Sequence, residues 1–388
     1  MHRYLPPPWP LKRILPFFIV MHLLSATPVS AERPYKRMLD DPLGFTGIEK
    51  TPADPATLST IAIGLFSPGE EDGPVGKAFT RGAALAIEQA NRGGGYRGIM
   101  FRLVRRWSDA PWADGAPQMV RLLTEDRVWA TIASIDGSGN IAQQIATKLY
   151  LPVVAPVSTD SSLTHARVPW IFRLAPGDGV QARLLIDQGI AKQGLTRVGL
   201  VTTTDHDGRM AAADLSAEMK KARVVPLFHL QLAGTRPETE TIARRIRAFS
   251  PDGLLLGMPV APAGLLLDAL TEASVRCPVF LPWSPGMDSV QYGGKLLTAA
   301  PFPPGGAANK AFAHAYFLRY GDLPPFTAAY AFDAANLIIR AIRSVGLTRS
   351  GLRKNLSELS GYEGATGPIS WDSGGSNAGH PVIPPHPR

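Results

Sequence analysis

The sequence predicts an α/β protein made of two doubly wound lobes, each a parallel sheet covered by helices, joined by a three-pass hinge. Short apolar runs bounded by turn residues alternate with segments of helical periodicity, which is typical of parallel sheets with helices on both faces. The alternation is interrupted and restarts, and it continues for longer than one sheet requires. With 388 residues, 45% of them hydrophobic, the chain has enough apolar side chains for two cores.

Short apolar runs supply the predicted strands. Each run is bounded by turn residues, which favours a buried parallel strand. The segments between the runs carry apolar residues at helical spacing, for example at Phe79, Ala83 and Ala86, and we assign these faces to the core rather than to a cofactor site. The predicted strands include 60–66, 128–134, 152–158, 197–203, 253–257 and 278–283.

Two interruptions of the pattern, at 172–182 and 296–307, mark predicted passages between the lobes. Residues 32–58 contain several prolines and no clear period, so they form an extension, either a flexible spacer or a strand that clasps a lobe. The predicted segments are 59–175 plus 302–365 for the first lobe, 176–301 plus 366–374 for the second lobe, and 375–388 for a loop-like C-terminal tail.

Residues 1–31 have the layout of a secretory signal peptide. Arg3, Lys12 and Arg13 precede an apolar run, and Val29 and Ala31 fit the −3 and −1 positions of a cleavage site. The apolar run is too short to span a membrane, and no cysteine follows it that could carry a lipid anchor. The sequence therefore predicts export to the periplasm.

Charge and cysteine content narrow the function classes. Cleavage after residue 31 removes three positive charges from the formal net charge of +8 and leaves +5. The remaining Lys and Arg residues are scattered without a basic stripe, which argues against nucleic-acid binding. Cys277 is the single cysteine, so an intramolecular disulfide is excluded and the fold must rely on its core.

The stretch "SIDGSGNIAQQIA" at 134–146 follows a predicted strand and opens a predicted helix. Gly137, Gly139 and Ala142 fit the loose dinucleotide fingerprint, and Asp160 lies at the distance of its acidic residue. However, this stretch follows the third strand of its lobe, whereas the fingerprint belongs after the first. The alternative is an anion site, in which free N–H groups at the helix start and the Ser138 hydroxyl hold a carboxylate or phosphate.

Hydroxyl groups also follow the next predicted strand, where Ser158 and Thr159 lie in "VSTDSS". Neighbouring parallel strands end at the same edge of a sheet, so these hydroxyls and the 134–146 stretch are predicted to face one small polar ligand. The alternative is that they are ordinary helix N-caps.

Motifs for catalysis or for metal binding are less specific than the strand-end hydroxyl groups described above. Pro285 follows Ser284 in "PWSPG" and lacks the N–H that an oxyanion hole requires, so a hydrolase nucleophile is not expected there. Asp205, His206 and Asp207 in "TDHDGR" could ligate a metal, but no second cluster has the spacing to complete a site, and a helix-capping turn is favoured. We therefore predict no catalytic residue, no metal and no cofactor.

The order of motifs from about 60 to 372 resembles the type I periplasmic binding proteins of ABC transporters, in the branch that binds leucine, isoleucine and valine or amides. The opening segment "IAIGLFSPGEEDGPVGKAFTRGAALAIEQANRGGGYRG" resembles the family's first strand, loop and helix. The segments "LPVVAPVSTDSSLT", "IFRLAPGDGVQA", "AYAFDAANLIIRAI" and "GATGPISWD" resemble its proline–hydroxyl strand end, first crossover, hinge-side helix and closing strand.

The resemblance implies which residues bind a ligand. Ser138 or its neighbours, together with Ser158 and Thr159, would hold a carboxylate. The places that hold an ammonium group in amino-acid binders fall on Pro259 and Ser284, so the usual ammonium cage is not expected. The candidate ligand-binding residues are Asp136, Ser138, Ser158, Thr159, Asp207, Trp283 (an apolar wall) and Ser284.

These observations predict an exported, monomeric solute-binding protein that captures a small polar ligand between two lobes and delivers it to an ABC permease in the membrane. An amino acid, a neutral amide, a urea-like molecule, a small acid and an aromatic compound all stay open as ligands. One alternative is a ligand-sensing subunit on the same fold. The other is an exported oxidoreductase that binds a nicotinamide cofactor at 137–142.

Overall fold

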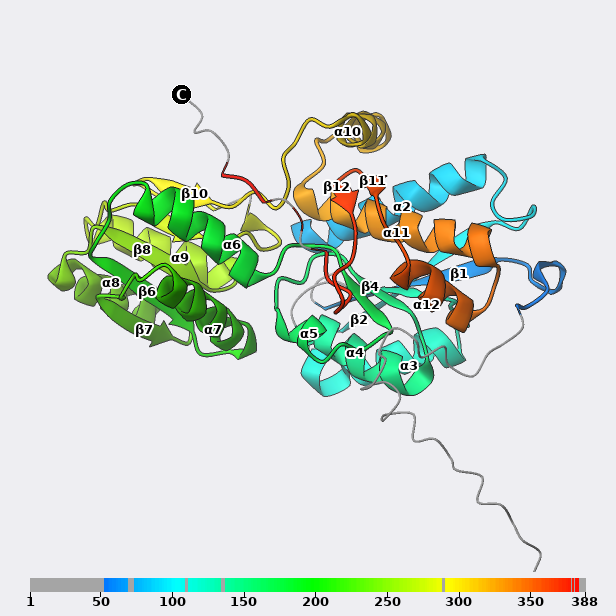
Figure 1. Ribbon diagram of the computed structural model, residues 1–388, viewed down its shortest axis with the longest axis horizontal. Coiled ribbons are helices and arrows are strands. Elements are labelled where there is room, and N and C mark those ends of the chain that lie inside the picture. The colour runs from blue at the N-terminus through cyan, green and yellow to red at the C-terminus, as the bar shows by residue number, and fades with distance from the viewer. Residues whose placement is uncertain are drawn as a thin grey trace, which may run out of the picture.

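The computed structural model describes residues 52–68, 73–108, 111–133, 137–287, 290–377, 379 and 381–383. The predicted signal peptide at 1–31 and most of the predicted extension lie outside the described residues. The described chain forms two α/β lobes side by side, with the first lobe at the right of Figure 1 and the second at the left. This arrangement confirms the predicted two-lobed fold class.

The first lobe contains a five-stranded parallel sheet with the strand order β2-β1-β3-β4-β5. Every residue of β3, β4 and β5 is buried, as expected for strands covered by helices on both faces. The strands are β1 (Ile61–Pro68), β2 (Phe101–Ser108), β3 (Thr131–Ala133), β4 (Val153–Ala155) and β5 (Ile171–Arg173). The helices between them are α2 (Pro74–Arg92), η2 (Pro111–Gly115), α3 (Ala116–Thr124), α4 (Gly137–Leu149) and α5 (Ser162–His165).

Helices from the C-terminal third of the chain complete the first lobe. Helix α11 packs closely on α2, because Gly82 of α2 has no side chain: a Cβ there would lie 2.1 Å from the carbonyl oxygen of Ala328. These helices are α10 (Ala307–Tyr320), α11 (Phe326–Val345) and α12 (Arg349–Ser357), followed by the antiparallel hairpin of β11 (Tyr362–Gly364) and β12 (Gly367–Ile369).

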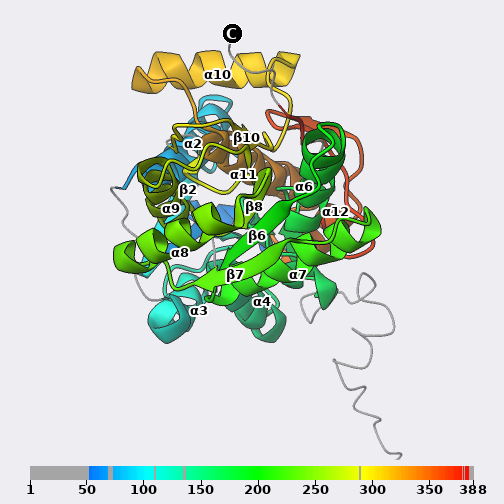
Figure 2. The ribbon, with the colours of Figure 1, turned by 90° about the vertical axis from the view of Figure 1, so that its left-hand side faces the viewer.

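The second lobe repeats the architecture with the strand order β10-β9-β8-β6-β7, again all parallel. Figure 2 shows this lobe from its outer end, with α8 and α9 on one side of the sheet and α6 and α7 on the other. The elements are α6 (Asp178–Leu184), η3 (Leu185–Ala191), β6 (Val198–Thr203), α7 (His206–Lys221), β7 (Phe228–Leu232), α8 (Arg236–Phe249), β8 (Gly253–Gly257), α9 (Val260–Glu272), β9 (Val279–Leu281) and β10 (Leu296–Thr298).

Three passages of the chain join the lobes. The first leads from β5 to α6, and the second leads from β10 back to α10. In the third, the backbone N–H of Asn377 donates to the carbonyl of Arg173 at 2.8 Å, and Val382 exchanges two backbone hydrogen bonds with Ala300. The C-terminal residues therefore run alongside the other two passages.

The structure corrects one predicted boundary. Residues 366–374 belong to the first lobe rather than the second, because β12 pairs with β11 and the Trp371 indole donates to the Leu356 carbonyl of α12 at 2.6 Å. The described part of the predicted loop-like tail, 375–388, contains no helix or strand, and isolated bridges join Ser376 to Arg173 and Val382 to Ala300.

The described end of the extension, residues 52–58, lies against the first lobe. It contains the short turn η1 (Pro55–Thr57), and the backbone N–H of Ala53 donates to the Leu347 carbonyl at 2.8 Å. In the described residues, no helix combines the length and the apolar character needed to cross a membrane.

Candidate functional site in the cleft between the lobes

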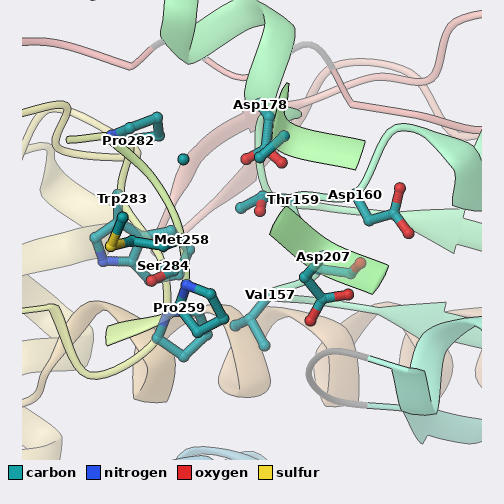
Figure 3. A pocket seen from close by; sticks show the side chains of 14 residues that line it. Val157, Thr159, Asp160, Asp178, Asp207, Met258, Pro259, Pro282, Trp283 and Ser284 are labelled. Atoms are coloured by element: carbon teal, nitrogen blue, oxygen red, sulfur yellow. The ribbon is translucent and has the colours of Figure 1, made fainter. Parts of the chain in front are cut away.

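A cavity lies between the two lobes, at the carboxyl ends of their strands (Figure 3). In open parallel sheets this edge is where ligands bind. The space between the side chains, including its open mouth, is about 580 Å³. It is lined by residues that follow β4, β8 and β9 and by the first turns of α6 and α7: Val157, Ser158, Thr159, Asp160, Asp178, Asp207, Ala211, Gly257, Met258, Pro259, Pro282, Trp283, Ser284 and Pro285.

One side of the cavity carries three carboxylates, and we call Thr159, Asp160, Asp178 and Asp207 the acidic wall (Figure 3). Asp178 is the most enclosed of the three: the residue is 7% exposed, and its carboxylate accepts a hydrogen bond from the Thr159 side chain. Burial raises the pKa of Asp178 to about 7, with a smaller contribution from the negative charge of Asp214. Near neutral pH the protonated and ionised forms of this carboxyl are therefore both populated.

Asp160 has a different environment. Its carboxylate accepts hydrogen bonds from the Asn140 amide at 3.0 Å and from the backbone N–H and hydroxyl of Ser162, both at 2.8 Å. Its Oδ2 also lies 3.0 Å from Nε2 of His206, a residue of the other lobe. Burial raises the pKa of Asp160, but these hydrogen bonds outweigh it and hold the pKa below its usual value.

The opposite side of the cavity is apolar, and we call Met258, Pro259, Pro282 and Trp283 the apolar wall (Figure 3). The Trp283 ring packs against Tyr330 of α11, with ring centroids 5.8 Å apart, and the residue is 2% exposed. Neither Nε1 of Trp283 nor Oγ of Ser284 has a hydrogen-bond partner among the described residues. Buried polar atoms are almost always paired in proteins, so two unpaired atoms beside a cavity indicate a place for a ligand or water.

Gln181 of α6 fixes the chain that carries Trp283. Its side-chain oxygen accepts from the backbone N–H of Trp283 at 2.7 Å, and its amide nitrogen donates to the Trp283 carbonyl at 3.3 Å and to the Pro176 carbonyl at 3.1 Å. The first hinge passage and the apolar wall are therefore tied together by one buried side chain.

Arg173 supports the acidic wall from behind. Its guanidinium donates to the Ser376 hydroxyl at 2.6 and 3.0 Å and to the Thr159 carbonyl at 3.2 Å. The side chain is 6% exposed and does not line the cavity. Arg173 therefore positions the backbone of the wall and joins it to the third hinge passage.

The start of α7 is built by a cap. Asp205 accepts from the backbone N–H of Gly208 at 2.7 Å, so it is the N-cap predicted for the "TDHDGR" turn. A Cβ at Gly208 would lie 2.1 Å from the Thr203 hydroxyl, so the absence of a side chain lets the helix begin directly against β6. This geometry brings His206 and Asp207 to the cleft.

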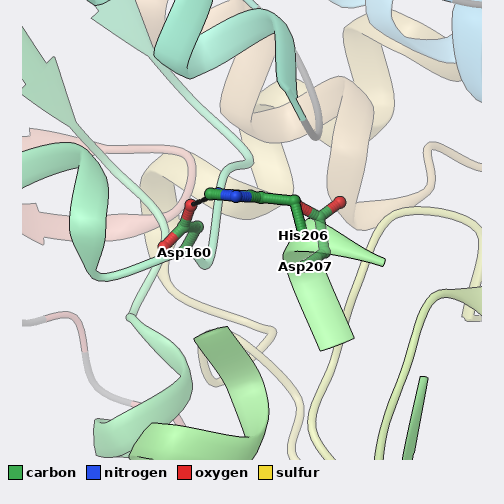
Figure 4. Close-up of side chains that lie close together, drawn as sticks. All are labelled: Asp160, His206 and Asp207. Atoms are coloured by element: carbon green, nitrogen blue, oxygen red, sulfur yellow. Dashed lines mark hydrogen bonds and ion pairs between the residues drawn. The ribbon is translucent and has the colours of Figure 1, made fainter. Parts of the chain in front are cut away.

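Three side chains at the cleft could together offer ligand atoms to a metal ion. Atoms of Asp160, His206 and Asp207 lie within 4.8 Å of one another, with Asp160 in the first lobe and the other two in α7 (Figure 4). In the sequence Asp160 lies 46 residues before His206, so spacing along the chain could not reveal this cluster. In the structure, the hydrogen bonds described above already occupy Asp160, and the observed role of the group is an inter-lobe contact.

Five predicted ligand-binding residues line the cavity: Ser158, Thr159, Asp207, Trp283 and Ser284. Ser138 is the second residue of α4, but its side chain lies outside what the structure describes, as does the whole of Asp136. The first turn of α4 is nevertheless beside Ser158, because a Cβ at Gly139 would lie 3.7 Å from the Ser158 hydroxyl.

Sequence reasoning missed Asp178 as a site residue and took Asp160 only as the acid of a dinucleotide fingerprint. Asp178 lies in the predicted crossover segment 172–182, and its position at the first turn of a helix after the crossover was the available signal. Nothing local shows that its carboxylate is buried between Thr159, Arg173 and Asp214.

The fold and the cavity define a class of protein: two α/β lobes that enclose a small-molecule site between them. A family model described as "Periplasmic binding protein" matches residues 60–383. The chain belongs to this family, as the motif order predicted, and its members are binding proteins.

Solved structures share the fold. The branched-chain amino acid transporter substrate-binding protein LivJ of Streptococcus pneumoniae, in complex with isoleucine, aligns with a TM-score of 0.75 and 21% identity over 83% of this chain and 94% of that one. A solute-binding protein of an ABC transporter from R. palustris, in complex with benzoate, aligns with a TM-score of 0.73 and 20% identity over 84% of this chain and 91% of that one. At these identities the likeness concerns the fold alone.

A curated relative, an amino acid binding protein of Pseudomonas aeruginosa, is 22% identical over 217 residues. The aligned region covers 55% of this chain and 58% of the relative, so the chain matches little more than half of that protein's length.

Proposed function

We propose that this chain is an exported solute-binding protein that captures a small polar solute between its lobes and delivers it to an ABC permease. The observation that carries the proposal is a single cavity lined from both lobes, by Thr159 and Asp160 on one side and by Met258 and Trp283 on the other. The predicted signal peptide at 1–31 supports export, and the structures of similar proteins in complex with isoleucine and with benzoate support small-solute binding.

Binding is coupled to closure of the lobes. A solute held by groups of both lobes interacts fully only when the lobes approach each other, so it shifts the population toward the closed form. The three hinge passages run side by side, with Asn377 bonded to Arg173 and Val382 bonded to Ala300, and we propose that the lobes rotate about them. A permease would then recognise the closed pair of lobes.

Within the site we assign contact with the solute to Ser158, Thr159, Asp207, Trp283 and Ser284, and we add Asp178 and Met258 to this set. Asp136 and Ser138 belong to the same proposal through the position of α4 beside Ser158. The arrangement needs no catalytic group, and we propose binding without turnover.

Thermal unfolding of the exported protein tests this function. The panel contains amino acids, amides, urea, small carboxylates, aromatic acids, alkylamines and nicotinamide cofactors. A solute at about 100 times its Kd stabilises the folded state by about 2.7 kcal/mol, which raises the Tm by a few degrees in a protein of this size.

Small-angle scattering then measures closure with the same solute. A shift in Tm together with a smaller radius of gyration supports the proposal. Chemical conversion of the solute, or a shift with a nicotinamide cofactor alone, contradicts it and favours the exported oxidoreductase.

A further inference from the structure

The charge of the cavity is negative. Asp160, Asp178 and Asp207 line it, whereas none of its described lining residues is Lys, Arg or His. Asp214 of α7 adds a fourth acid close behind Asp178. The buried Arg173 guanidinium bonds to Ser376 and to backbone carbonyls, and its positive charge acts on Asp178 and Asp160, so it offsets one of the four acidic charges. His206 contacts Asp160. A positively charged solute is therefore favoured over a negatively charged one.

Asp178 is the carboxylate best placed to hold such a charge. It is buried, and the Thr159 hydroxyl is the side-chain donor that it has. Asp160, in contrast, already accepts from Asn140, from Ser162 and contacts His206. Asp207 is half-exposed at the mouth of the same wall, across the first turn of α7.

The opposite wall indicates the rest of the solute. Trp283 and Met258 offer an apolar surface, and the Trp283 ring can also attract a cation. The unpaired Nε1–H of Trp283 is a donor, so it calls for an uncharged or negatively charged acceptor on the solute. The Ser284 hydroxyl, also unpaired, can accept or donate.

We propose that the cavity selects a small amine that lacks a carboxylate, such as an amino alcohol or an amino amide with a short apolar chain. Its ammonium group binds Asp178 and Asp207, its neutral oxygen accepts from Trp283, and its apolar chain lies along Met258 and Pro259. This inference rests on the proposed function and gives the solute class for the same site. A solute carboxylate would be desolvated beside three protein carboxylates, which repel it.

Calorimetric titration of the exported protein with five compounds that share an isobutyl group tests the solute class. Leucinol carries an ammonium and a neutral oxygen, isopentylamine the ammonium alone, leucine both charges, isocaproate the carboxylate alone, and isocaproamide no charge. We expect leucinol to bind tightest and isopentylamine next, and leucine and isocaproate to bind at least tenfold more weakly, with the neutral amide between these groups.

Proton linkage gives a second readout. Binding of an ammonium requires ionised Asp178, so affinity for isopentylamine is expected to rise about tenfold from pH 6 to pH 8, across the pKa of about 7. Alkylamines keep their charge throughout this range. Asp214, Asp160 and Arg173 face Asp178 and stay in place in an Asp178→Asn variant, so loss of this pH dependence in the variant identifies Asp178 as its source.

Variants complete the test. Asp178→Asn and Asp207→Asn are each expected to weaken leucinol binding at least tenfold, and Asp207 serves if the Asp178 variant fails to fold, because it is half-exposed. Asp187→Asn, an exposed acid on the following helical segment η3, removes the same charge and is expected to leave affinity unchanged.

The outcomes separate this inference from the proposed function. Equal or tighter binding of leucine, isocaproate or isocaproamide overturns the amine class but leaves a solute-binding protein. If no amine binds while another compound closes the lobes, the amine class is likewise overturned and the solute-binding function stands. Failure of all solutes to bind or to close the lobes overturns both proposals.

Discussion

Two carboxylates in this protein are similarly buried but differ in the hydrogen-bond donors around them. Asp333 of α11 is 0% exposed, and it accepts the backbone N–H groups of Ala365 and Thr366 at 2.8 Å each and the Thr366 hydroxyl at 2.7 Å. Asp178 of α6 is 7% exposed, but its side-chain donor is Thr159 and it faces a cavity. Burial raises the pKa of both, to about 6 for Asp333 and about 7 for Asp178.

We interpret this difference as the one between a structural acid, Asp333, and the acid that we propose binds the solute, Asp178. The donors around Asp333 belong to the turn of the β11–β12 hairpin, so this carboxylate holds the hairpin against α11 within the first lobe. Asp178 has capacity for further donors, and the cavity provides space for a molecule that supplies them. Burial and a shifted pKa are common to both, so the donors around the carboxylate distinguish the two roles.

The largest effect is expected from Asp333→Ala. The change leaves two backbone N–H groups and a hydroxyl unpaired in a buried position, so the free energy of unfolding should fall by about 4 kcal/mol. Chemical denaturation measures this loss. Solute affinity should not change under conditions where the variant is folded.

A matched control for this variant is Asp322→Ala, because Asp322 is exposed and pairs with Arg81 at 3.0 Å on the surface of the first lobe. Exposed pairs contribute about 0–1 kcal/mol, so its effect should be small. A loss for Asp333→Ala no larger than that of the control would contradict the role of Asp333 in holding the hairpin.

The next effect is the pH dependence of stability. Because the folded state raises the pKa of Asp178 from 3.8 to about 7, it binds more protons than the unfolded state between these values. Its contribution to stability therefore decreases as pH rises from about 4 to about 7. Asp178→Asn should remove this term, so the difference in unfolding free energy between variant and wild type should change by about 3 kcal/mol over that range.

Denaturant titrations at several pH values without solute measure this slope. Asp187→Asn is the control, because it removes an exposed acid of the same lobe. If the unfolding free energies of wild type and Asp178→Asn change with pH in parallel, the pKa of Asp178 is not raised in the folded state.

The strand ends of the site and Asp207 could be predicted from the sequence, whereas Asp160 and Asp178 could not be predicted as residues of this site. Ser158 and Thr159 follow an apolar run, and the carboxyl ends of parallel strands converge in this type of fold, so the local pattern was sufficient to predict them. Ser284 and Asp207 came from the family resemblance. Asp178 and Asp160 became functional candidates through contacts with residues from other elements, such as Asp214 and His206. No local periodicity encodes those contacts.

The same limit explains why residues 366–374 were predicted to belong to the second lobe. The apolar segment 367–372 has the pattern of a strand, and that pattern does not specify which sheet the strand joins. Its partner is β11, which immediately precedes it, and the Trp371 indole bonds to Leu356, so it stays with the first lobe. Pairing partners depend on tertiary packing, which a single sequence shows only indirectly.

A smaller effect is expected at the contact between the lobes. His206→Ala removes the 3.0 Å contact with Asp160, which joins α7 of the second lobe to the segment after β4 of the first. Loss of about 1 kcal/mol of inter-lobe interaction should weaken solute binding about fivefold, because the closed form becomes less favourable. Titration calorimetry measures the affinity, with His314→Ala on the exposed face of α10 as control. Unchanged affinity would mean that this contact is equally favourable in the open and closed forms.

The smallest effect concerns the unpaired indole in the apolar wall. Trp283→Phe removes the Nε1–H, and Trp170→Phe removes an equally unpaired Nε1–H from the core of the first lobe, away from the cavity. In both variants the loss of buried ring atoms destabilises the folded state, and the removal of an unpaired buried N–H stabilises it. These effects oppose each other, so the unfolding free energies should change by less than about 1 kcal/mol.

Only Trp283→Phe should weaken solute binding, by about threefold, because Trp283 lines the cavity and Trp170 lies in the core of the first lobe away from it. Calorimetric titration of both variants with the same solute measures the difference. An equal affinity in the two variants would show that the Trp283 N–H faces no part of the solute, and it would leave Asp178 and Asp207 as the groups that select it.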